Sequence, residues 1–190
     1  DVEVSLVSSK PEKLATAPAA VFVITQEDIR RSGATSIPEL LRMVPGIQVA
    51  RMDANKWAVS ARGMNGRFAR FMLVQIDGRT VYTPLFSGVF WEVQDTFLPD
   101  IERIEVIRGP GSTMWGANSV HGIINIVTRS ARKTQGGLAT TGAGTEERAF
   151  GAARYGGKLG EEAYYRVYGK TFERDDGYLE NRDGHDDWRM

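Results

Sequence analysis

The chain of 190 residues contains no cysteine, which excludes disulfide frameworks, cysteine-ligated zinc, iron–sulfur clusters and thiol nucleophiles. Histidine is almost as scarce, since His121 and His185 are the only two. A histidine metal centre or a Ser-His-Asp triad is therefore not favoured. No run of about 18 apolar residues occurs, and no transmembrane helix is expected. The 24 basic residues balance the 24 acidic ones, so the chain has no excess of positive charge that would attract nucleic acid. We expect no metal, no cofactor and no nucleic-acid partner.

Proline is missing from the last third of the chain, although seven prolines occur before it, and glycine is about twice as dense there. Such a change of composition indicates a domain boundary near residue 131. The sequence therefore predicts an N-terminal extension over residues 1–17, a globular domain over 18–130 and a different kind of structure over 131–190.

Residues 18–130 read as a mixture of short helices and strands. Thr25 and Ser36 are each followed three residues later by an acid, Asp28 and Glu39, which is the pattern of a helix N-cap. The first helix should stop at Gly33 and the second at Pro45-Gly46. Short apolar runs predict strands at residues 21–24, 47–51, 57–62, 71–76, 80–82, 104–108 and 122–129.

Residues 131–190 contain three segments of alternating side-chain character, at 137–145, 148–158 and 163–173. In the third, Ala163, Tyr165 and Val167 share one face, and Arg166 and Lys170 share the other. Segments of about ten residues with this alternation are typical of strands in a transmembrane barrel. An ordinary antiparallel sheet in water is the alternative. Three strands cannot close a barrel, so we expect the chain to be the N-terminal part of a larger protein.

Several motifs that would indicate catalysis are incomplete. The glycine-rich run at residues 109–116 lacks the lysine of a P-loop, and its third glycine falls two positions late for a dinucleotide fingerprint. The acids of residues 175–187 miss the spacing of a calcium loop. Asp95, Asp100, Glu102 and Glu105 are interleaved with arginines, which favours ion pairing over acid–base chemistry. We do not expect an enzyme.

Other segments carry a family resemblance. They lie at residues 18–29 (PAAVFVITQEDI), 37–41 (IPELL), 44–49 (VPGIQV), 59–64 (VSARGM), 74–79 (VQIDGR), 100–111 (DIERIEVIRGPG), 115–118 (WGAN) and 122–127 (GIINIV). In this order they resemble the plug domain of TonB-dependent outer-membrane receptors, and residues 131–190 resemble the first barrel strands of such a receptor.

The resemblance implies an α+β fold: a plug domain with a small mixed β-sheet and short helices, followed by antiparallel strands of an incomplete transmembrane β-barrel. The plug would lie in the lumen of a barrel of about 22 strands in the bacterial outer membrane. The implied function is active uptake of a scarce nutrient, a ferric siderophore above all, driven by energy that TonB transmits. The alternatives are uptake of cobalamin, haem or a carbohydrate, a passive or structural outer-membrane barrel, and a soluble domain.

The family also implies a TonB box, a short periplasmic segment that pairs as a strand with TonB. The β-prone segment just before the plug matches it in position: Val4, Ser5, Leu6, Val7 and Ser8. As plain sequence this segment is an exposed N-terminal stretch, and that reading stays open.

Apical loops of a plug contact the extracellular ligand. The resemblance places three groups of residues there: Arg51, Asp53 and Asn55; Asn65, Arg67 and Phe68; and Tyr82, Phe86, Phe90 and Trp91. Arginine and aromatic side chains suit an anionic, planar ferric chelate. The alternative for Phe86, Phe90 and Trp91 is hydrophobic packing within the plug.

Arg62 and Arg108 each end a strand and are followed by glycine. In the family that the chain resembles, arginines at these two motifs pair with glutamates of the inner barrel wall and hold the plug in place. Guanidinium forms bidentate bonds to carboxylate, which suits that role. The alternative is that both solvate the end of the sheet.

Overall fold

The computed structural model describes residues 3–4, 12–13, 20–63, 66–68, 71–83, 85–109, 115, 118–175 and 188–189. The chain divides into two compact units, one of residues 1–50 and 57–128 and the other of residues 51–56 and 129–190. The domain limits that the sequence indicates at residues 18 and 131 stay predictions. Within the described ranges, no helix has the length and apolar character needed to cross a membrane.

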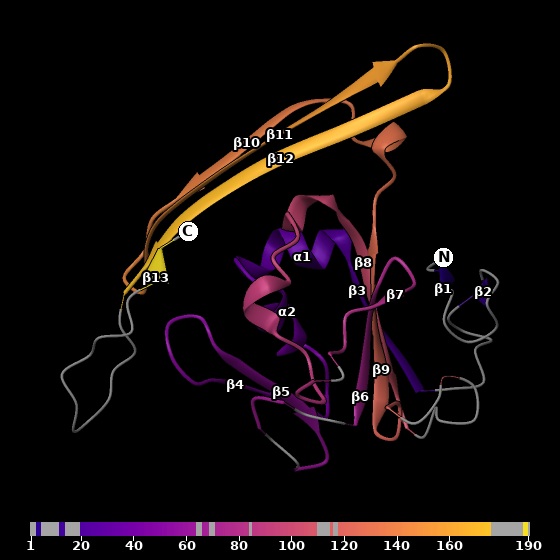
Figure 1. Cartoon of the computed structure of the whole chain (residues 1–190), viewed down its shortest axis with the longest axis vertical. Helices are drawn as coiled ribbons and strands as arrows, with labels where there is room; N and C mark the ends of the chain where they lie inside the picture. The colour runs from indigo at the N-terminus through magenta and orange to yellow at the C-terminus, as the bar shows by residue number, and fades with distance from the viewer. Residues whose placement is uncertain are drawn as a thin grey trace. The chain divides into compact units, whose positions relative to one another are not determined.

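A five-stranded mixed sheet forms the centre of the first unit, with the strand order β3-β8-β9-β6-β7 (Figure 1). All neighbours pair antiparallel except β6 and β9, which run parallel. The isoleucines of β9 are fully buried on both faces of the sheet, since Ile124 and Ile126 lie in one apolar cluster and Ile123 in another. The strands are β3 (Ala20–Thr25), β6 (Met72–Ile76), β7 (Arg79–Thr80), β8 (Ile101–Arg108) and β9 (Gly122–Thr128).

Two short helices begin where the capping signals placed them. Helix α1 (Gln26–Ser32) has the capping box of Thr25 and Asp28 and ends at Gly33, whose φ of 70° is left-handed. Helix α2 (Ile37–Leu41) has the box of Ser36 and Glu39. It ends at Leu41, before the predicted stop at Pro45-Gly46, because residues 42–46 form turns instead.

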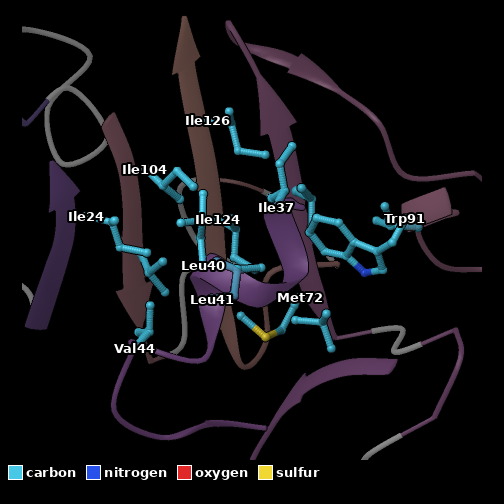
Figure 2. Close-up of a cluster of buried hydrophobic side chains, with 14 of the residues drawn as sticks. Ile24, Ile37, Leu40, Leu41, Val44, Met72, Trp91, Ile104, Ile124 and Ile126 are labelled. Atoms are coloured by element: carbon cyan, nitrogen blue, oxygen red, sulfur yellow. The ribbon is translucent and has the colours of Figure 1, made fainter. Parts of the chain in front are cut away.

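The main core lies between α2 and one face of the five-stranded sheet (Figure 2). Leu40 and Leu41 are fully buried there, against isoleucines of β3, β8 and β9. Trp57 and Trp91 complete the same core. A smaller apolar cluster of Leu73, Ile107 and Ile123 is separate from the main core.

A turn at Asp77-Gly78 joins β6 to β7. Both residues have positive φ, 51° and 78°, as a two-residue hairpin turn of this type requires. The carboxylate of Asp77 also accepts hydrogen bonds from the amide and hydroxyl of Thr128, both at 2.7 Å. The turn is thereby tied to the end of β9.

Shorter elements complete the first unit. Strands β4 (Ile47–Arg51) and β5 (Trp57–Ala61) form a two-stranded sheet, and β1 (Glu3–Val4) pairs antiparallel with β2 (Glu12–Lys13). Two 3-10 helices, η2 (Trp91–Val93) and η3 (Leu98–Asp100), precede β8. Strand β8 starts at Ile101, earlier than the predicted Ile104, because it follows η3 directly.

The second unit is a four-stranded antiparallel sheet in the order β10-β11-β12-β13. Its long strands curve together in Figure 1. They are β10 (Gly136–Gly142), β11 (Glu147–Leu159), β12 (Ala163–Arg174) and the two-residue β13 (Trp188–Arg189), which pairs with the end of β12 and was not predicted. A 3-10 turn, η4 (Ala131–Lys133), precedes β10.

The two faces of this sheet differ in chemistry. The register pairs Tyr155 with Val167 and Leu159 with Ala163, so these side chains share one face. We call it the apolar face; between residues 151 and 171 it carries no charged residue within the strands. Its large side chains are exposed: Tyr155, Leu159, Tyr165 and Val167. The charged face carries Arg154, Lys158, Arg166 and Lys170.

Candidate functional site

An aromatic cluster of Phe68, Phe86 and Phe90 joins two of the predicted ligand loops. The rings of Phe68 and Phe86 stack at 5.4 Å between centroids. Phe90 meets both edge-on, at 5.1 Å from Phe68 and 5.3 Å from Phe86. The structure thus brings Phe68 of the second predicted loop together with Phe86 and Phe90 of the third.

The backbone around residues 83–88 explains why the rings meet. Thr83 and Gly88 exchange two backbone hydrogen bonds, of 2.8 and 3.3 Å, across a tight turn in which Ser87 has a φ of 55°. A Cβ on Gly88 would lie 2.7 Å from the Cα of Phe68. Only glycine therefore lets the Phe68 backbone approach this turn.

The charge of Arg67 is compensated beside the cluster. Its Nη2 donates to Glu92 Oε1 at 2.7 Å, and its guanidinium lies 5.2 Å from the ring centroid of Phe68 and 5.8 Å from that of Phe90. Glu92 is a residue that sequence reasoning missed, because no local motif links it to Arg67. The cluster therefore presents an aromatic surface with a neutralised cation, and Phe86, 49% exposed, is its accessible ring. Such a surface can stack against a flat or apolar group.

The loop of Arg51, Asp53 and Asn55 is held by hydrogen bonds of its own and by an ion pair between Arg51 Nη1 and Glu146 Oε2 at 2.6 Å. Arg51 donates to the carbonyl oxygens of Asp53 and Ala54, at 3.1 and 3.2 Å. Asp53 Oδ1 accepts from the amides of Asn55 and Lys56, at 3.1 and 2.7 Å, and Oδ2 pairs with Lys56 Nζ. Asn55 is buried. In this arrangement the polar groups of Arg51 and Asp53 are used to hold the loop in place.

Burial alone would raise the pKa of Asp53, but the hydrogen bonds from the Lys56 side chain and from the amides of Asn55 and Lys56 outweigh it and hold the pKa below the ordinary 3.8. Because the folded pKa is depressed, the stabilisation is complete above the ordinary value and is lost as the pH falls through the lower folded value.

We expect Asp53→Asn to lower the free energy of unfolding at neutral pH by at most about 1 kcal/mol, since Lys56 is partly exposed. The difference from wild type should shrink as the pH falls below about 4. Urea unfolding of both proteins across this range measures it. A difference that grows in acid would contradict the assigned role of Asp53.

Tyr82 and Trp91 lie differently from the phenylalanines. Tyr82 is half-buried. Trp91 is 5% exposed and belongs to the main core (Figure 2), which is the packing role that the sequence left open for it. As a ligand contact it stays a prediction, and it would require the core to open. Asn65 lies outside the described residues.

Arg62 and Arg108 are both exposed. Arg62 has a left-handed φ of 60° at the end of β5, and Arg108 Nη1 donates to the carbonyl oxygen of Pro45 at 3.0 Å. The buried Glu105 is paired with Arg103, at 2.7 Å. Both candidate anchor arginines are thus displayed at the surface of the first unit.

The predicted TonB box is described only at Val4, which lies in β1 and pairs with Glu12. Residues 5–8 of the box lie outside the described residues. The structure therefore shows strand conformation at one of the five predicted box residues, Val4.

The family described as TonB-dependent Receptor Plug Domain matches residues 13–123. The chain is 32% identical to an iron-regulated outer membrane virulence protein of Vibrio cholerae, over 87% of this chain and 26% of that protein. It is 30% identical to the vitamin B12 transporter BtuB of Vibrio vulnificus, over 71% of this chain and 22% of that one. The chain spans about a quarter of the length of these curated relatives.

Among solved structures, the siderophore receptor PirA of Pseudomonas aeruginosa matches with a TM-score of 0.58 and 27% identity, over 84% of this chain and 29% of that one. Its likeness covers both the mixed sheet with short helices and the antiparallel strands that follow.

Proposed function

The chain belongs to the family of TonB-dependent receptors, and from this membership we propose that it is the N-terminal part of an outer-membrane receptor that imports a scarce nutrient with energy transmitted by TonB. The proposed ligand is a ferric siderophore. The plug would lie in the barrel lumen, with the N-terminus in the periplasm.

The observation that carries this proposal is the exposed apolar face of the sheet β10–β12. A sheet in water buries its apolar face and exposes its charges. Here Tyr155, Leu159 and Val167 are exposed, at 56, 70 and 59%, and between residues 151 and 171 the charges of β11 and β12 lie on the other face. Apolar side chains outside and polar ones inside are the pattern of a barrel wall in lipid. A plug followed by such a wall favours active uptake over a passive pore, which has no use for a plug.

Two observations bear on the ligand. The similarity to the PirA siderophore receptor and to an iron-regulated outer membrane protein favours a ferric siderophore. The similarity to a vitamin B12 transporter favours cobalamin as the second candidate. The neutralised Arg67 beside the aromatic cluster suits an aromatic or apolar part of either ligand more than a strongly anionic part.

Growth of a strain that lacks the full-length gene tests the proposal, with ferric siderophores and cobalamin as the supplied nutrients. We expect loss of growth on a ferric siderophore, restored by the gene and abolished again when an uncoupler removes the proton-motive force. Uptake that persists with the uncoupler would indicate a passive barrel. Loss of growth on cobalamin alone would favour the second candidate.

Leu6→Pro tests the TonB box. Proline fixes φ and removes a backbone donor, so an added strand should not form at this position. We expect uptake to fall to the level of a strain without TonB, while ligand binding to whole cells is retained. Leu6→Val, which keeps strand propensity, is the control. Normal uptake by the proline variant would remove the box from this segment.

Arg62 and Arg108 are proposed to hold the plug to glutamates of the barrel wall. Among the described residues of β10–β12, the charged face offers Glu147, which already pairs with Arg174 at 3.4 Å. The glutamates are therefore expected outside the described residues of β10–β12.

We expect a full-length Arg62→Ala, Arg108→Ala double variant to make the plug protease-sensitive and to admit small antibiotics, while the barrel stays folded. Arg79→Ala, an exposed arginine in the β6–β7 hairpin, is the control. If the double variant matches wild type in both assays, these arginines do not anchor the plug.

A further inference from the structure

The segment between β9 and β10, residues 129–135, is the linker through which the chain passes from the plug to the strand sheet. It belongs to the second unit together with β10–β12. Its 3-10 turn η4 is closed by the amides of Lys133 and Thr134, which donate to Ser130 and Ala131 at 2.9 and 3.3 Å. Thr134 is 3% exposed, so the far end of the linker is buried.

Two arginines of the charged face hold the two ends of this linker. Arg166 Nη1, on β12, donates to the carbonyl oxygen of Arg129 at 2.7 Å. Arg154 Nη1, on β11, donates to the carbonyl oxygen of Thr134. Carbonyl groups in an irregular segment need partners when water is excluded, and a guanidinium supplies them in a fixed geometry.

The strand surface is shaped to receive the linker. Gly156 pairs with Arg166 in the β11–β12 register, and a Cβ at Gly156 would overlap the carbonyl oxygen of Thr134. The linker backbone thus lies directly on the strand at a position where only glycine fits. Beside it, Arg132 lies 5.3 Å from the ring centroid of Tyr164.

We propose that Arg154 and Arg166 fix the linker to the charged face as a rigid anchor, so that the C-terminal end of the plug stays in place while other parts of the plug move during transport. That other parts of the plug move during transport rests on the proposed function. Arg154 and Arg166 are positioning residues, because they hold the attachment point of the linker.

Hydrogen exchange of the full-length receptor, without ligand, tests the anchor. We expect slow exchange of the Lys133 and Thr134 amides in wild type. In an Arg154→Gln, Arg166→Gln double variant their exchange should accelerate by about tenfold or more, since local opening no longer breaks two charge-assisted bonds. Lys170→Gln, on the same face of β12, is the control and should leave the linker unchanged.

Gly156→Ala provides an independent test because it removes no charge. Its methyl group should displace Thr134 and accelerate the same two amides. Slow exchange of the β11 and β12 amides in each variant shows that the sheet is folded. The sheet itself could open in the double glutamine variant. In that case the double variant Arg154→Lys, Arg166→Lys, which keeps both positive charges, is used in its place. Wild-type protection of the linker in the variants would overturn the anchor.

The same measurement with the purified periplasmic domain of TonB tests whether the anchor holds during transport. We expect faster exchange in β3 and unchanged exchange at Lys133 and Thr134. If the Lys133 and Thr134 amides exchange faster after TonB is added, the C-terminal end of the plug is not held in place during transport. Absence of any change in the plug would count against the proposed function and not against the anchor, which the variants decide.

Discussion

Replacing Arg103 with leucine is expected to cost the first unit about 3–5 kcal/mol of its free energy of unfolding, because it strands a buried carboxylate. Glu105, in the middle of β8, is 0% exposed, and Arg103 Nε donates to its Oε1 at 2.7 Å. Asn125 on the neighbouring strand β9 donates to the other oxygen at 3.4 Å. Without Arg103, the carboxylate of Glu105 loses the guanidinium that pairs with it at a site where water cannot replace it.

A double variant separates the pair from its members. Arg103→Leu, Glu105→Leu removes both charges and should recover most of the loss, since apolar residues often replace a buried pair without cost. Arg30→Leu breaks the exposed pair with Glu27 and should leave stability unchanged. Urea unfolding followed by the fluorescence of the buried Trp57 and Trp91 measures all three. If Arg103→Leu alone is as stable as Arg103→Leu, Glu105→Leu, the burial of Glu105 does not depend on its pairing with Arg103.

Val167→Arg is expected to destabilise the full-length receptor in lipid vesicles by about 2–4 kcal/mol, if Val167 lies near the middle of the bilayer. Val167 is on the apolar face of β12, where its neighbours across the sheet are uncharged. An arginine there must place its charge in hydrocarbon or distort the bilayer to reach water.

The adjacent residue gives the matched control. Tyr168 lies on the charged face, opposite Arg154. Tyr168→Arg should therefore cost much less than Val167→Arg, with about 1 kcal/mol or less from the repulsion between like charges in a cross-strand pair. The folded fraction of each variant in vesicles, followed against urea, gives the two costs. Equal costs at 167 and 168 would indicate a sheet in water instead of a wall in lipid.

Much of the fold could be predicted because its signals are local. The capping boxes at Thr25 and Ser36, the turn at Asp77-Gly78 and the alternation around Val167 each depend on residues within a few positions of one another, and each is present in the structure. The likeness to the plug family then supplied the mixed sheet, whose strand order no local pattern encodes.

The site was predictable only in part, because its contacts are not local. Phe68 and Phe86 were both placed in ligand loops, but their stacking depends on a glycine twenty residues after Phe68 in the sequence, Gly88. The pairing of Arg67 with Glu92 turned an expected anion contact into a compensated charge. The linker carbonyls held by Arg154 and Arg166 carry no side-chain signal at all.

The strand order of the plug sheet also sets the sequence of events in which the protein folds. Ala20 pairs with Arg108, and Met72 pairs in parallel with Gly122, so the sheet closes only when segments far apart in the chain have met. Pairings of this kind form slowly, since the entropy of closing a long loop is lost before any contact repays it. The β11–β12 hairpin needs only the short turn between Leu159 and Ala163 and can form in microseconds. We therefore expect the plug sheet to close later than the β11–β12 hairpin forms.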